Sequence, residues 1–119
     1  MSEQSQSEAI EISMEEAKHY VENRDQMNRL IANPDFDKLI TQGYLDKEAA
    51  RLVLAKAEPN MQSDESQQLL DKQINAIGYV RLYIRTIIQY GDMAERDITA
   101  SKAELEIAEQ EELDAVAGD

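Results

Sequence analysis

The chain has 119 residues, with 12 lysines and arginines against 25 aspartates and glutamates, which gives a formal net charge of −13. It has one histidine and no cysteine, which excludes disulfides, thiolate nucleophiles and zinc sites built from cysteine. The length suits one domain, and the acidic excess opposes direct binding to nucleic acid or an anionic membrane, because both are polyanions.

The negative charge is concentrated at the two ends of the chain. Residues 1–13 carry three acids and no base, and residues 102–119 carry seven acids and one base. The stretch between them is nearly neutral. We therefore expect a flexible acidic start over residues 1–12, one helical domain over residues 13–112, and a disordered tail over residues 113–119.

The first predicted helix covers residues 14–32. Ser13 and Glu16 have the spacing of a capping box, in which each side chain satisfies the other residue's backbone N–H group. Apolar residues then recur at helical spacing, interrupted by Arg24. The helix is expected to end before Pro34, because proline disfavours the helical conformation in the residue that precedes it.

Two short helices follow, over residues 34–42 and 46–57. Asn33 can cap the first of them, and Pro34 suits its first position. Gly43 is expected to end that helix in the left-handed conformation. The two helices would then form a helical hairpin or corner.

The strongest periodic signal predicts a long helix over residues 64–112. Two neighbouring rows of mostly apolar residues follow alternating four- and three-residue steps, the pattern of a coiled coil. The same step continues past Gly91, where the helix can either kink or pass straight through. The first row is Leu70, Ile74, Ile77, Arg81, Ile84 and Ile88, and the second is Leu69, Gln73, Ala76, Val80, Tyr83, Ile87 and Tyr90.

The predicted fold is therefore all-α, with three shorter helices packed on the first part of a long C-terminal helix. Glu8–Ser13 is the only strand candidate, and it alternates polar and apolar residues over too short a stretch to predict one. Because the long helix exceeds what the shorter helices can cover, its last part is expected to project or to pack on another chain.

The sequence contains no catalytic or cofactor-binding motif. His19 is the only histidine, and no cysteine or second histidine can join it in a metal site or a nucleophilic pair. The four glycines are isolated from one another, so none of them forms a phosphate-binding loop. We expect no enzyme activity, no cofactor and no metal.

Residues 72–91 contain three basic residues and no acid, unlike the rest of the chain. Arginine and tyrosine often dominate interface energies, so this stretch is a candidate contact surface. Alternatively, its arginines pair internally with acids of neighbouring helices. Phe36 and Tyr44 are further candidates, although they can instead fill the junction between the shorter helices. The candidate partner contacts are Phe36, Tyr44, Tyr79, Arg81, Tyr83, Arg85 and Tyr90.

Two stretches of the chain carry a family resemblance. The first reads ANPDFDKLI over residues 32–40 and continues as GYLDKEAARLV over residues 43–53, and the second reads IGYVRLYIRTIIQY over residues 77–90. With the Glu-rich end, they resemble small acidic helical proteins encoded by tailed bacteriophages, over roughly residues 12–112. The resemblance implies a minor structural or assembly protein, found in the host cytoplasm during assembly or in the virion. It implies no catalytic residue.

The sequence thus favours a non-enzymatic phage virion structural or assembly protein that binds itself and another virion or assembly protein through its helices. One alternative is an acidic mimic of nucleic acid that inhibits a host enzyme, which would need its acids on a rigid face. A second is a transient scaffold or chaperone of head morphogenesis. None of these functions requires a membrane, and the start of the chain lacks the basic and apolar regions of a secretory signal.

Overall fold

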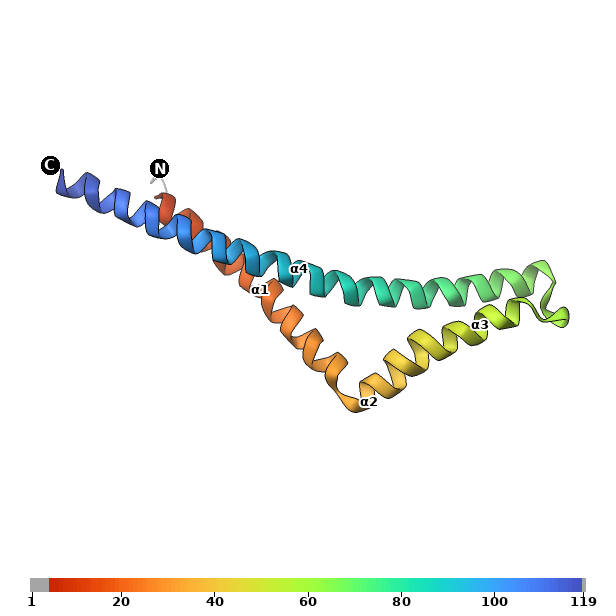
Figure 1. The fold of residues 1–119 in the computed structure, drawn as a ribbon. Helices are drawn as coiled ribbons and strands as arrows, with labels where there is room; N and C mark the ends of the chain where they lie inside the picture. The colour runs from red at the N-terminus through yellow and green to blue at the C-terminus, as the bar shows by residue number, and fades with distance from the viewer. Residues whose placement is uncertain (1–4, 119) are drawn as a thin grey trace. The chain divides into compact units, whose positions relative to one another are not determined.

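The computed structural model describes residues 5–118, which are helical apart from short connections and contain no strand (Figure 1). The all-α prediction is therefore confirmed. No helix in this part of the chain combines the length and the apolar character needed to cross a membrane. The elements are α1 (Gln6–Ala32), α2 (Pro34–Phe36), η1 (Asp37–Glu48), α3 (Ala49–Lys56), η2 (Pro59–Met61) and α4 (Asp64–Ala117).

The chain divides into two compact units, which are described separately. Unit 1 combines the residues up to Asp25 with those from Ile87 onward, and unit 2 is Gln26–Thr86. The boundaries fall inside α1 and α4, so each of these helices contributes to both units.

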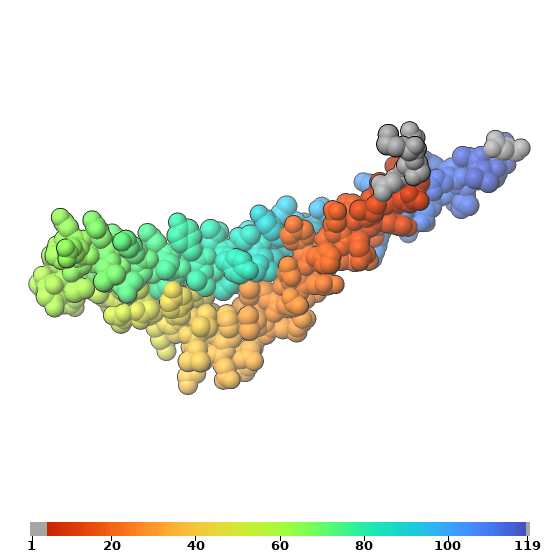
Figure 2. Space-filling view, turned by 180° about the vertical axis from the view of Figure 1, so that it is seen from behind, coloured from red at the N-terminus to blue at the C-terminus, as the bar shows by residue number. Residues whose placement is uncertain are grey.

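Unit 2 has an apolar core formed by η1, α3 and the first part of α4. Four side chains are buried at its centre: Leu45, Leu52, Leu70 and Ile77. In Figures 1 and 2, α3 lies alongside the first part of α4. Each fully buried side chain of this size contributes about 1.5–3 kcal/mol before the entropy of folding is subtracted. Leu70 and Ile77 belong to the first predicted row, so this row supplies the side chains by which α4 contributes to the core.

The η1 segment is a π-helix, with i→i+5 backbone hydrogen bonds, and it is continuous with α2 and α3. The prediction of two helices separated at Gly43 is therefore wrong, and no glycine among the described residues has a positive φ. Apolar spacing explains the wider turn, because Ile40, Leu45 and Ala49 are five and four residues apart and all contribute to the core. An i→i+5 helix places such residues on one face.

The start of α2 follows the prediction. The Asn33 Oδ1 atom accepts hydrogen bonds from the backbone N–H groups of Asp35 at 2.9 Å and Phe36 at 3.2 Å. Pro34 occupies the first helical position, where its missing N–H costs nothing.

The start of α1 does not follow the prediction, because the helix begins at Gln6 rather than at residue 14. Ser13 lies inside the helix, so the expected capping box does not mark its start. A serine followed three residues later by glutamate also occurs upstream, and there the Ser5 hydroxyl accepts a hydrogen bond from the backbone N–H of Glu8 at 3.1 Å. The expected flexible start is thus wrong for residues 6–12, and residues 1–4 lie outside the described residues.

Unit 1 is a pair of helices in which α1 lies along the last part of α4, as both Figure 1 and Figure 2 show. The expectation that the first helix packs on the first part of α4 is wrong for this portion of α1. Among the described residues of the unit, the buried ones are small or polar. They are Ser7 and Arg24 from α1, with Gly91, Ala94 and Ala108 from α4.

The long helix α4 passes through Gly91 and continues to Ala117. The expected tail is therefore helical over residues 113–117, while Asp119 lies outside the described residues. Alanine and glutamate are strong helix formers, and this stretch is rich in both. Near this end, the buried Ser7 hydroxyl donates to the carboxylate of Glu112 at 3.0 Å.

Candidate functional site

Three of the predicted partner contacts are bonded, packed or partly covered within unit 2. The Arg81 guanidinium donates to the backbone carbonyl of Leu45 at 2.6 Å and forms an ion pair with Asp46. Tyr44 packs against the apolar core, and Phe36 is half-buried. Arg81 therefore pairs with an acid of a neighbouring helix, as the alternative interpretation of the basic stretch predicted.

Three other predicted contacts lie on the surface of unit 2. Tyr79 is 72% exposed and Tyr83 is 65% exposed. Arg85 is also exposed, and among the described residues it forms no ion pair. These side chains are available to another molecule.

The two predicted rows on α4 have different surroundings in unit 2. The first row packs into the core, whereas the second remains on the surface. We call the exposed apolar members of the second row the outer row. It consists of Leu69, Ala76, Val80 and Tyr83.

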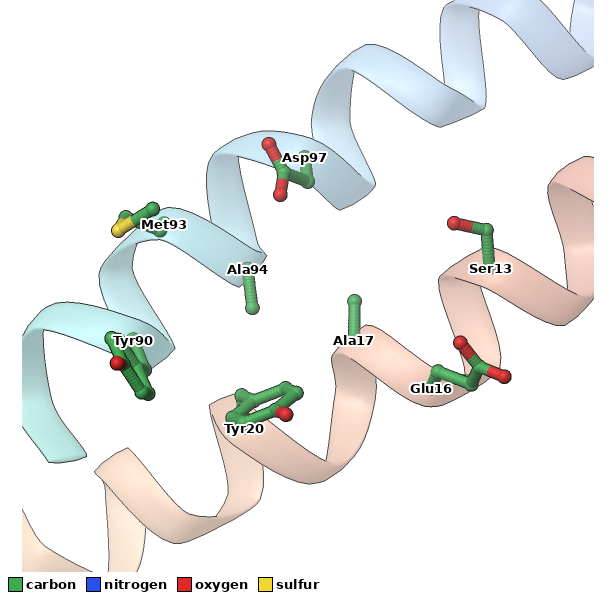
Figure 3. A pocket seen from close by; sticks show the side chains of 8 residues that line it. All are labelled: Ser13, Glu16, Ala17, Tyr20, Tyr90, Met93, Ala94 and Asp97. Atoms are coloured by element: carbon green, nitrogen blue, oxygen red, sulfur yellow. The ribbon is translucent and has the colours of Figure 1, made fainter.

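Unit 1 contains a groove of about 270 Å³ between α1 and α4 (Figure 3). The side chains of Ala17 and Ala94 point toward each other across it. The volume is below the roughly 300–1,000 Å³ of sites for drug-sized ligands, and it suits one or two side chains. We call it the acidic groove. Its lining is Ser13, Glu16, Ala17, Tyr20, Tyr90, Met93, Ala94 and Asp97.

The walls of the acidic groove are aromatic in one part and charged in another. Tyr20 and Tyr90 meet edge to face, with ring centroids 6.0 Å apart, which is a favourable aromatic geometry. Both rings remain about half exposed. Glu16 and Asp97 form no ion pair among the described residues. The groove therefore offers apolar surface and two carboxylates to a ligand.

Arg24 joins the two helices of unit 1. Its guanidinium donates to Asp92 at 3.0 Å and to Glu95 at 2.9 Å, and it also bonds Asp25 beside it on α1. The hydrogen bond with Glu95 is the largest cause that raises the pKa of Arg24, and the same bond lowers the pKa of Glu95. The sequence pattern marked Arg24 only as an interruption of an apolar face.

The net charge divides along the boundary between the units. Unit 2 has eight acidic and eight basic residues, whereas unit 1 has 17 acidic and 4 basic residues. The entire −13 therefore belongs to unit 1. Residues 6–13 and 102–117, which belong to the acid-rich ends of the sequence, lie in one pair of helices.

Within residues 5–118, no three acidic or histidine side chains come together in a way that could hold a metal ion. Comparison of the chain with protein-family models, with curated proteins and with solved structures gave no match. The function must therefore be inferred from the surfaces of the molecule itself.

Proposed function

We propose that this protein is not an enzyme and that it acts by binding proteins, copies of itself included, through its helices. The observation that carries the proposal is the outer row. It places large apolar side chains on the surface of α4, beside the buried row that holds unit 2 together.

The outer row has the chemistry of an interface. Leu69 and Tyr83 are both more than half exposed, and apolar side chains gathered on one face often mark a contact site. Burying each of them against a partner is worth about 1.5–3 kcal/mol before the cost of association is subtracted. Tyr79, next to the row, adds a residue type that is enriched at interface centres.

The biological setting that we propose comes from the resemblance to small acidic proteins of tailed bacteriophages. In that setting the protein is a structural or assembly component of the virion, and its partners are other copies and a second virion or assembly protein. Mass spectrometry of purified mature particles and of their precursors would test this setting. Presence in precursors alone would favour a transient scaffold.

Sedimentation velocity over a concentration series tests self-association. We expect the protein to associate at tens of micromolar, and Tyr83→Glu to shift the midpoint of association at least tenfold upward. Leu82→Glu is the matched control, because Leu82 is also exposed on α4 but lies outside the outer row. A protein that stays monomeric throughout the series would contradict self-association.

A second candidate function is an acidic mimic of nucleic acid. It gains support from unit 1, where 17 acidic residues occupy mainly two paired helices rather than free tails. A rigid acidic face can occupy the basic groove of a nucleic-acid enzyme. The test is competition with DNA for a panel of nucleases and polymerases at low salt. Inhibition that disappears at high salt would favour this function, and the absence of inhibition would exclude it for that panel.

A further inference from the structure

We infer that self-association joins two different surfaces, with the outer row of one copy docked in the acidic groove of a second copy. This inference rests on the proposed self-association and adds which two surfaces meet in it. The contact is heterologous, because unit 2 of one molecule meets unit 1 of the next.

The distribution of charge favours this contact over the two symmetric ones, in which an outer row meets an outer row or a groove meets a groove. Residues 72–86 of α4 in unit 2 hold three bases and no acid, whereas unit 1 carries the whole −13. Pairing two outer rows would bring the acid-free stretches at residues 72–86 of two copies together, and pairing two grooves would bring two strongly acidic units together. Like charges across an interface cost energy. The contact between unit 2 and unit 1 is the arrangement that places opposite charges together.

The basic residues near the outer row are available for this contact. Lys72 lies three residues after Leu69 and four before Ala76, so it borders the row on the helix surface. Among the described residues, Lys72 and Arg85 form no ion pair. Arg81 differs, because it is bound to Asp46.

The acidic groove has the complementary chemistry. Its alanines leave space for an apolar side chain, and its half-exposed tyrosines supply contact area. Glu16 and Asp97 can accept charge-assisted hydrogen bonds from a lysine or arginine at the edge of the row. A volume of about 270 Å³ accepts a side chain of the outer row.

A heterologous contact has a consequence that a symmetric one lacks. Each copy that docks its outer row still presents its own acidic groove, so association continues into a ring or an open chain. Such growth is a useful property for a protein of assembly.

The decisive experiment mixes two blocked variants. Tyr83→Glu blocks the outer row, and Asp97→Lys blocks the groove by replacing one of its two carboxylates with a cation. Each variant alone lacks one of the two surfaces and should be monomeric. Mixed in equal amounts, they should form a dimer that grows no further, because only one intact row and one intact groove are available to meet.

Two control variants match these changes in charge. Leu82→Glu lies on the same helix as Tyr83, and Glu106→Lys lies on the same helix as Asp97 but outside the groove. Both should associate as the unmodified protein does. Circular dichroism checks that every variant is folded. If a blocked variant does not fold, Leu69→Glu in the outer row and Met93→Lys in the groove form a second blocked pair.

The outcomes separate the two proposals. If the unmodified protein associates but the mixed variants remain monomeric, the outer row and the acidic groove do not meet and this inference is wrong, while the proposed self-association stands. The inference is equally wrong if either blocked variant alone associates as the unmodified protein does, because the contact is then symmetric. If the unmodified protein never associates, the proposed self-association itself fails. For the mixed dimer, raising NaCl from low to high concentration should weaken binding by roughly tenfold or more, and an affinity that ignores salt would contradict the electrostatic basis of the contact.

Discussion

Arg24 lies against Gly91 so closely that a Cβ atom on Gly91 would be 2.1 Å from the Cβ atom of Arg24. Non-bonded carbon atoms prefer separations of about 3.5–4.0 Å, so α1 can take this position only because residue 91 has no side chain. The guanidinium then reaches Asp92 and Glu95 on the same helix. The absent side chain and the ion pairs together define the contact between α1 and α4 in unit 1.

Replacement of Gly91 by alanine should loosen unit 1. Alanine favours a helix over glycine by about 1 kcal/mol, but overpacking a filled contact typically costs about 1–3 kcal/mol. The clash involves the Cβ and Cγ of Arg24, which cannot swing away without moving α1. Amide hydrogen exchange should therefore show faster exchange for the part of α1 in unit 1.

Gly78 provides the matched control on the same helix. A Cβ atom there would meet nothing within 4 Å, so Gly78→Ala should stabilise unit 2 by up to about 1 kcal/mol through helix propensity. Urea unfolding followed by circular dichroism measures this change. Equal effects of the two substitutions would show that the approach of Arg24 places no constraint on residue 91.

Features that depend on neighbouring residues could be predicted from the sequence. The Asn33 cap and the long helix through residues 64–112 depend on local hydrogen bonds and on a repeated apolar step. The predicted helix end at Gly43 is wrong, because glycine permits the left-handed conformation of a helix end without requiring it. Here Leu45 and Ala49 extend the same buried face in a wider helix.

The acidic groove could not be predicted, because its two sides are far apart in the sequence. Ala17 and Ala94 meet only when α1 chooses the last part of α4 as its partner, and no local pattern specifies that choice. A signal did exist in Arg24, a basic residue that interrupts the apolar face of an acid-rich helix. Such a residue predicts an acidic neighbour, although it does not identify Glu95.

Leu52 and Leu54 test the core of unit 2. Leu52 is 2% exposed and Leu54 is 69% exposed on the same short helix. Leu52→Ala should therefore reduce the free energy of unfolding by about 2–5 kcal/mol, whereas Leu54→Ala should change it by less than about 0.5 kcal/mol. Urea unfolding of both variants gives the comparison. A large loss for Leu54→Ala would place that side chain in an interface formed in solution.

The ion pair of Glu95 predicts a defined pH dependence. The hydrogen bond from Arg24, and then its charge, hold the pKa of Glu95 below the ordinary value of 4.5. A carboxylate with a lowered folded-state pKa adds stability that is complete above its unfolded pKa and is lost as the pH falls through the folded value. The unmodified protein should therefore be more stable than Glu95→Gln at pH 7. The difference should begin to shrink as the pH falls through 4.5 and should disappear once the pH is below the folded-state pKa of Glu95.

Thermal unfolding by circular dichroism from pH 7 to pH 3 measures that difference. Glu106→Gln is the matched control, because Glu106 is exposed on the same helix and has no ion pair among the described residues. It should show no such pH-dependent difference. A stability difference between Glu95→Gln and the unmodified protein that stays constant with pH would show that the ionised carboxylate adds nothing.

The charge of unit 1 predicts that salt strengthens the pairing of α1 with α4. Repulsion within a unit of net charge −13 opposes that pairing, and the Debye length falls from about 30 Å at 0.01 M salt to about 3 Å at 1 M. Screening thus removes the long-range repulsion more fully than it weakens the Arg24 contacts at about 3 Å. Amide exchange of α1 in unit 1 should slow as NaCl rises, whereas exchange of α3 in neutral unit 2 should barely change.

The Tyr83→Glu variant suits this measurement, because its association is blocked and salt then acts only on the pairing of α1 with α4. Faster exchange of α1 at high salt would instead mean that the Arg24 ion pairs, rather than the net repulsion, control the pairing of the two helices.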